Sequence, residues 1–139
     1  MTSTPDTAVV DRLRAELNGQ VVRPGDDEYD AARTLFAGGI DRRPAVIVRP
    51  TDADGVARVV SAARDTGLDL AVRSGGHSGA GHSVCDDGIV LDLSRMQALE
   101  VDVEGRTAWA QTGLTAGGYT TAVGEHGLAT GFGDTGSVG

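Results

Sequence analysis

The chain of 139 residues contains no lysine, because all twelve of its basic residues are arginine. This lack excludes a Walker-type phosphate-binding lysine and a Schiff-base lysine from the chain. Cysteine is limited to Cys85, so no disulfide can form within the sequence. A single unpaired cysteine is typical of proteins from a reducing compartment, and we therefore expect a cytoplasmic protein.

Clustered positive charge and long apolar segments are also missing. The formal net charge is −8 and the arginines are scattered, so the sequence offers no basic surface for nucleic acid. No apolar run approaches the roughly 20 residues of a membrane span. The N-terminus lacks the basic and apolar regions of a secretory signal. We expect neither a nucleic-acid nor a membrane partner.

Glycine, in contrast, is abundant, with 21 residues that lie mostly in the second half and follow no fixed period. Glycine adopts positive φ and lets the backbone approach a ligand closely, so such clusters indicate tight turns or binding loops. The length suffices for one domain with a modest core. The glycine-rich end, 131–139, is followed by no helix or strand. We therefore interpret the chain as the N-terminal portion of a longer protein.

Hydrophobic periodicity predicts an alternation of helices and strands. Helices are expected over 7–17, after the turn at 24–25, over 51–66 and over 115–126, and strands over 44–50, 68–73, 88–94, 98–105 and 106–113. The strand–helix–strand order over 44–73 predicts a βαβ unit with parallel strands. The last two strands should form a hairpin around 104–106. The predicted fold class is α+β, a small mixed β-sheet with flanking helices on one side.

Several single residues carry structural predictions of their own. Asp26 or Asp27 is expected to cap the second helix, and Thr51 with Asp54 to form a capping box for the third. Gly67 and Gly127 should end helices, and Thr115 should begin one. The tryptophan of the chain, Trp109, is expected in the core.

The stretch AVRSGGHSGAGHSVCDDG, residues 71–88, is the most informative segment. A predicted strand ends at Arg73, and glycines and serines follow it. Successive backbone N–H groups without bulky side chains can hold a pyrophosphate. The hydroxyls of Ser74, Ser78 and Ser83 could add donors. An ordinary flexible loop is the simpler interpretation of the same pattern.

The histidines and the cysteine of this stretch leave a metal site open as an alternative. His77, His82 and Cys85 are residue types that zinc accepts. Their H-x4-H-x2-C spacing matches no standard zinc pattern, however, and no second pair of ligands closes the site. The spacing therefore argues against a metal.

Two further motifs, one for dinucleotide binding and one for serine hydrolysis, can be compared with the sequence and its predicted elements. Residues 131–136 match G-x-G-x-x-G, but that motif needs a preceding strand and a following helix, and neither is predicted here. The chain contains no G-x-S-x-G elbow, so serine hydrolysis has little support. Neither motif indicates a function.

Taken together, these segments resemble a known family. PAVIVRP, TDADGVARVV, GLDLAVRSGGHSGAGHS and GIVLDLSRM are similar to the N-terminal part of the FAD-binding domain of the vanillyl-alcohol oxidase and para-cresol methylhydroxylase group. The R-x-G-G-H form is similar to its berberine-bridge-enzyme-like branch, which includes 6-hydroxynicotine and oligosaccharide oxidases. The resemblance covers about 44–139. It implies a para-cresol methylhydroxylase-type FAD-binding domain over 44–139 that continues further in relatives, and the predicted helices before it make 1–43 a helical lead-in.

The resemblance implies FAD as the cofactor, joined through a ring nitrogen of His77 to the 8α-methyl group of the flavin. Backbone amides of 72–78 would surround the pyrophosphate, 79–83 would continue that wall, and 134–139 would pass along the isoalloxazine ring. Some relatives have a second flavin-linked cysteine where this chain has Thr135, so one covalent bond is expected. The cofactor-binding residues implied are Val72, Arg73, Ser74, Gly75, Gly76, His77, Ser78, Gly79, His82, Ser83, Asp134, Thr135, Gly136, Ser137, Val138 and Gly139.

The implied activity is that of a FAD-dependent oxidoreductase. It transfers a hydride from an alcohol or amine C–H bond of a small molecule to flavin N5, with dioxygen as the acceptor. No residue of this chain can be named as the catalytic acid or base. The alternatives are a truncated or split-enzyme fragment, inactive alone or paired with a complementary chain, and a small metal-binding domain.

Overall fold

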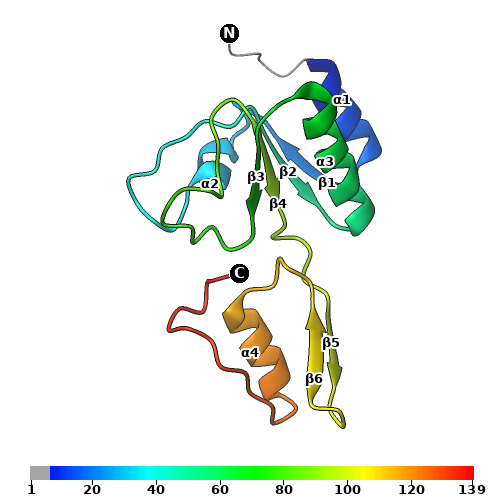
Figure 1. Cartoon of the computed structure of the whole chain (residues 1–139), viewed down its shortest axis with the longest axis vertical. Helices are drawn as coiled ribbons and strands as arrows, with labels where there is room; N and C mark the ends of the chain where they lie inside the picture. The colour runs from blue at the N-terminus through cyan, green and yellow to red at the C-terminus, as the bar shows by residue number, and fades with distance from the viewer. Residues whose placement is uncertain (1–6) are drawn as a thin grey trace.

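The computed structural model describes residues 7–139 and divides them into a four-stranded sheet with helices and a two-stranded hairpin with one helix (Figure 1). The elements in chain order are α1 (Thr7–Glu16), β1 (Gly19–Val22), α2 (Tyr29–Arg33), β2 (Val46–Pro50), α3 (Ala53–Thr66), β3 (Leu70–Arg73), β4 (Ile89–Asp92), β5 (Leu99–Asp102), β6 (Thr107–Ala110) and α4 (Ala116–Gly124). No helix among these residues is both long enough and apolar enough to cross a membrane.

The main sheet has the strand order β1-β2-β4-β3, in which β2, β4 and β3 are parallel and β1 is antiparallel to β2. The predicted βαβ unit is confirmed, but β4 lies between its two strands. All four residues of β4 are buried, whereas β3 is partly exposed. A strand buried on both faces occupies the centre of a sheet, and the more exposed β3 takes the edge.

The sheet is covered on both faces, so the expectation of helices on one side is wrong. Successive strand residues point to opposite faces. Val46 and Val48 pack with α1 and α3 in one core cluster, and Ile47 packs with Tyr29 and Ala32 of α2 in the other. The helix α2 was predicted, but the face of the sheet that it covers was not, because the helix spans hardly more than one turn and shows no clear apolar stripe.

The N-cap of α3 lies one residue after the predicted position. The carboxylate Oδ1 of Asp52 accepts a hydrogen bond from the backbone N–H of Gly55 at 2.7 Å, as an N-cap does. The Thr51 hydroxyl instead donates to the Asn18 carbonyl at 3.0 Å, so Thr51 ties the helix to the turn before β1. Gly67 ends the helix with a φ of 68°, as predicted.

The predicted caps of α2 are also wrong. Glu28 occupies the N-cap position without a side-chain bond. Asp26 instead accepts from the backbone N–H of Arg23 at 2.8 Å and closes the preceding turn. The polar run therefore forms the turn rather than the helix start.

The hairpin and α4 follow the sequence more closely. β5 and β6 pair antiparallel, and Thr115 caps α4 by accepting from the Gly118 N–H. Trp109 is 58% exposed, which corrects its assignment to the core. Its neighbour Ala110 faces α4, and alternation along the strand turns Trp109 to the opposite, uncovered face.

Candidate functional site

The carboxyl end of β3 leads directly into the glycine-rich loop that the sequence singles out. Gly76 and Gly81 have φ values of 72° and 75°, a left-handed conformation that favours glycine. A Cβ on Gly76 would come within 3.2 Å of the Arg73 guanidinium. Glycine therefore lets the chain reverse sharply just before His77.

The imidazole of His77 has two partners. Its Nε2 lies 2.9 Å from the Ser137 hydroxyl oxygen. One ring face stacks on Phe36, with ring centroids 4.1 Å apart and an interplanar angle of 20°. These contacts join three segments that are far apart in the sequence. His82, in contrast, is exposed, and its backbone N–H donates to the Ser78 hydroxyl.

The two glycine-rich loops that the sequence singles out lie against each other. A Cβ on Gly75 would come within 2.5 Å of the Ser137 carbonyl oxygen and of the Gly139 nitrogen. Figure 1 shows the C-terminal end returning to the junction between the main sheet and the hairpin. The structure thus brings the predicted residue Gly75 against the backbone of 137–139.

The start of α4 holds the second loop in place. The Ala116 N–H donates to the Val138 carbonyl and the Gly117 N–H to the Gly136 carbonyl, both at 2.8 Å. Within the same loop, the Thr135 hydroxyl donates to the Asp134 carboxylate at 3.2 Å. The backbone N–H groups in the first turn of a helix have no acceptor within the helix. Here two of them bind carbonyl groups of the second loop.

The first loop presents free backbone donors. Across residues 7–139, the backbone N–H groups of 75–80 find no hydrogen-bond acceptor. Arg42 fixes the end of the loop by donating to the carbonyls of Gly81 and Val84 at 3.3 and 3.0 Å. A run of N–H groups on a tethered backbone suits the oxygens of an anionic group, such as a pyrophosphate.

Val72 and Arg73 lie at the start of the loop, and Ser83 lies at its end. Arg73 donates to the Ala32 carbonyl at 2.5 Å, and burial lowers the pKa of its guanidinium. Val72 is 52% exposed on β3, and Ser83 is buried beyond the loop. The contacts of His77 with Phe36 and Ser137 involve none of these three side chains. The Ser74 hydroxyl donates to the Thr112 carbonyl, so side chains anchor the loop at Arg73, Ser74 and His77.

Cys85 and the metal alternative can be judged on geometry. The Cys85 sulfur lies 3.6 Å from the Ile89 carbonyl oxygen, and burial raises the pKa of the thiol. Among the residues that the structure describes, no three His, Cys, Asp or Glu side chains converge as metal ligands. The grouping of His77, His82 and Cys85 in sequence therefore does not become a cluster in space.

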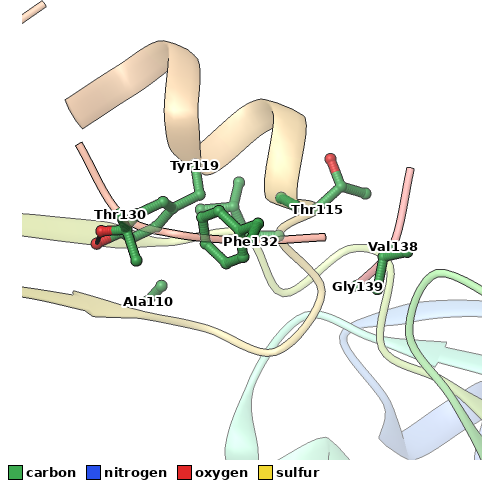
Figure 2. A pocket seen from close by; sticks show the side chains of 9 residues that line it. Ala110, Thr115, Tyr119, Thr130, Phe132, Val138 and Gly139 are labelled. Atoms are coloured by element: carbon green, nitrogen blue, oxygen red, sulfur yellow. Dashed lines mark hydrogen bonds between the residues drawn. The ribbon is translucent and has the colours of Figure 1, made fainter. Parts of the chain in front are cut away.

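An apolar cavity of about 310 Å³ lies beside the second loop, between α4 and the hairpin. Figure 2 shows the Phe132 ring between α4 and the strand that carries Ala110. Tyr119 meets Phe132 edge to face, with centroids 5.4 Å apart. Val138 and Gly139 line the opposite end of the cavity from Thr130. The second loop therefore separates this cavity from the His77 loop.

Phe36 and Arg42 belong to this site, although the sequence did not indicate them. Both lie in the connection between α2 and β2, outside the glycine motifs. The scarcity of aromatic residues, with two phenylalanines in the chain, is the one signal that draws notice to Phe36. No local pattern predicts which distant loop these residues contact.

Known proteins are similar to this chain in sequence and in fold. A family model described as "FAD binding domain" matches residues 44–139. The chain is 37% identical over 113 residues to (R)-6-hydroxynicotine oxidase of Paenarthrobacter nicotinovorans, which covers 81% of this chain and 25% of that protein. It is 33% identical over 116 residues to berberine bridge enzyme-like C-1 of Nicotiana tabacum, covering 78% and 21%.

A solved structure agrees with these sequence matches. The crystal structure of 6-hydroxy-D-nicotine oxidase from Arthrobacter nicotinovorans matches with a TM-score of 0.86 and 36% identity, over 89% of this chain and 27% of that one. The predicted fold class and the predicted cofactor, FAD, are thereby confirmed. The chain spans about a quarter of the length of these relatives. It belongs to the FAD-binding family of the vanillyl-alcohol oxidase and para-cresol methylhydroxylase type, and it corresponds to the N-terminal part of that FAD-binding domain.

Proposed function

We propose that this chain is the part of a flavin-dependent oxidoreductase that holds FAD, with His77 bound covalently to the flavin. The substrate is a small molecule oxidised at an alcohol or amine C–H bond, and dioxygen is the electron acceptor. The protein acts in the cytoplasm, as its single cysteine suggests. Family membership supports the cofactor, and the proposal adds the linkage, the substrate class and the acceptor.

The observation that carries this proposal is the position of the His77 imidazole, where the two glycine-rich loops meet. Nε2 is engaged by the Ser137 hydroxyl at 2.9 Å. Among the described residues, Nδ1 has no hydrogen-bond partner. A neutral imidazole with Nε2 protonated has its free lone pair on Nδ1. This nitrogen is the one that we propose to form the bond.

The backbone around His77 suits FAD through its free donors and its lack of bulky side chains. The free N–H groups of 75–80 are donors for the pyrophosphate, and the glycines among them keep side chains out of the way. Residues 79, 82 and 83 continue this wall, and 134–139 form the opposite one. Thr135 has a hydroxyl where a second covalent bond would need a thiol, so we propose attachment through His77 alone.

The covalent attachment balances with dioxygen as the oxidant. The attachment would form a C–N bond at Nδ1 and would break one C–H bond of the flavin 8α-methyl group and the N–H bond at Nε2. The two protons and two electrons released reduce dioxygen to hydrogen peroxide. When bound, the flavin accepts a hydride from the substrate and passes the electrons to dioxygen. The chain's own part is to bind and orient the cofactor, and we assign no catalytic acid or base to it.

The test of the linkage uses the whole protein that contains this chain. The purified protein is precipitated with acid and washed, and the flavin absorbance of the redissolved precipitate is measured. We expect flavin in the wild-type precipitate and none with His77→Ala. Cys85→Ala and His126→Ala, which remove the thiol and an exposed histidine, should retain the flavin.

A wild-type precipitate without flavin would disprove the covalent linkage, and flavin that persists in His77→Ala would assign the bond to another residue. The acceptor is tested separately by turnover in air. We expect one hydrogen peroxide for each substrate oxidised, and turnover that needs an artificial acceptor would disprove the role of dioxygen.

A further inference from the structure

Phe36 has a large apolar side chain that does not pack in either hydrophobic core cluster. It is 68% exposed, whereas its neighbour Leu35 is 5% exposed and packs in the cluster beneath α2. The one ring contact of Phe36 within the described residues is the stack on His77. Aromatic rings gain from stacked contacts beyond the area that they bury.

Backbone bonds fix Phe36 relative to the His77 loop. The Phe36 N–H donates to the carbonyl of Gly76, the residue before His77, at 3.1 Å. Arg73 reaches the same segment by donating to the Ala32 carbonyl at 2.5 Å. Two hydrogen bonds therefore join α2 and the residues after it to the start of the loop. These bonds hold the backbone of Phe36 beside the loop, so the ring lies within reach of His77.

The imidazole needs such support because its own backbone is poorly constrained. Glycines precede His77 at 75 and 76 and follow it at 79 and 81, and glycine gives the chain the most conformational freedom. The Ser137 hydroxyl holds one edge of the ring, and Phe36 covers one face. An in-plane hydrogen bond and a face-on stack together restrict rotation about both side-chain torsions.

We infer that Phe36 is a positioning residue for His77, holding the imidazole in the orientation from which Nδ1 bonds to the flavin. This inference rests on the proposed covalent attachment and goes beyond it, because it assigns a role to a residue of the lead-in that precedes 44–139. Phe36 takes no part in the bond itself. Its effect is on the rate of attachment and not on the affinity for FAD.

The test follows attachment over time in the whole protein, prepared without flavin and then given FAD. Flavin in acid-washed precipitates gives the rate of covalent attachment, and quenching of flavin fluorescence gives total binding. Phe36→Leu retains an apolar side chain but removes the stack, and we expect attachment about three- to tenfold slower with FAD affinity unchanged. Phe36→Tyr retains the ring, and its rate should stay within about twofold of wild type.

A second measurement reports the stack without FAD. Histidine labelled with ¹³C and ¹⁵N gives ring resonances for the three histidines, and those lost in His77→Ala belong to His77. The Phe36 ring current should shift these resonances in wild type and in Phe36→Tyr. In Phe36→Leu they should move to the values of an unstacked imidazole, while those of His82 and His126 stay in place.

The outcomes separate this inference from the proposed function. Slower attachment and lost ring-current shifts in Phe36→Leu, both restored in Phe36→Tyr, support the positioning role. Wild-type attachment in Phe36→Leu, or slow attachment in Phe36→Tyr, overturns it while the covalent linkage stands. If wild type attaches no flavin, the proposed function fails, and the positioning role fails with it even where the ring-current shifts are present.

Discussion

At the scale of single residues, Cys85 shows how burial decides the chemistry of a side chain. Its thiol lies among backbone carbonyls, including that of Ile89 at 3.6 Å, and burial raises its pKa. The fold therefore favours the protonated thiol. The stability that this preference contributes is present below the pKa of the unfolded thiol. It is lost as the pH rises through the higher pKa of the folded one.

We predict that Cys85 reacts slowly with iodoacetamide in the native protein. The thiolate is the reactive form, and a raised pKa leaves little of it at pH 8. The rate should be about tenfold or more below that of the urea-unfolded chain, and its pH midpoint should lie above that of the unfolded thiol. Mass spectrometry of quenched samples measures both. A native midpoint at or below the unfolded one would contradict the burial argument.

His77 and Phe36 mark what the sequence can and cannot predict about a site. The role proposed for His77 is implied by a family resemblance, and the residues that carry this resemblance, a strand end, a glycine pair and a histidine, are adjacent in the chain. Phe36 contacts His77 only in the folded chain, and no pattern in the residues around Phe36 predicts that contact. Helix α2 ends at Arg33, and Phe36 lies in the connection after it, which matches no motif.

At the scale of the elements, a buried ion pair joins two parallel strands. The Asp92 carboxylate, 2% exposed at the end of β4, accepts from Arg49 Nε of β2 at 2.8 Å. Its other oxygen accepts from the Ser94 backbone N–H at 3.0 Å. Both carboxylate oxygens thus have donors, as a buried charge requires.

We predict that Asp92→Ala lowers the free energy of unfolding by about 3 kcal/mol, because it leaves the Arg49 charge without its buried partner. Urea unfolding followed by circular dichroism measures this. The control is Arg64→Ala, which breaks an exposed pair with Asp65 and should change stability by less than about 0.5 kcal/mol. Equal effects of the two variants would show that the buried pair contributes no more than a surface pair.

Helix bounds were predictable where an apolar stripe is long, as in α3, and caps were less so. Thr51 and Asp52 are both good capping residues, and local sequence does not choose between them. The choice is made by the Asn18 carbonyl, which accepts the Thr51 hydroxyl and leaves Asp52 to cap the helix. The strand order of the sheet could not be predicted either, because the order of strands along the chain does not reveal that β4 lies between β2 and β3.

At the scale of the whole molecule, the sheet and the hairpin meet at the two glycine-rich loops. Gly75 is a point of close approach, with no room for a side chain against the backbone of Ser137 and Gly139. We predict that Gly75→Val forces the loops apart, weakens FAD binding about tenfold or more, and leaves the secondary structure in place. Fluorescence titration with FAD and circular dichroism measure the two effects.

The matched control for Gly75→Val is Gly131→Ala, because an added Cβ there meets nothing within 4 Å. FAD binding in this control should equal that of wild type. Limited proteolysis adds a second comparison, since loops that no longer touch should be cleaved faster within 128–139. Wild-type affinity and wild-type cleavage in Gly75→Val would show that the contact between the loops does not support the site.

Strand β1 affects whether copies of the molecule associate with one another. It pairs along the length of β2, whose residues are almost all buried. A chain shortened to begin at Pro44 would leave β2 as an open sheet edge, with unpaired N–H and C=O groups beside an apolar surface. Such an edge is a template for pairing with another molecule and for aggregation. The lead-in thus protects the sheet from self-association at one end and supports His77 through Phe36 at the other.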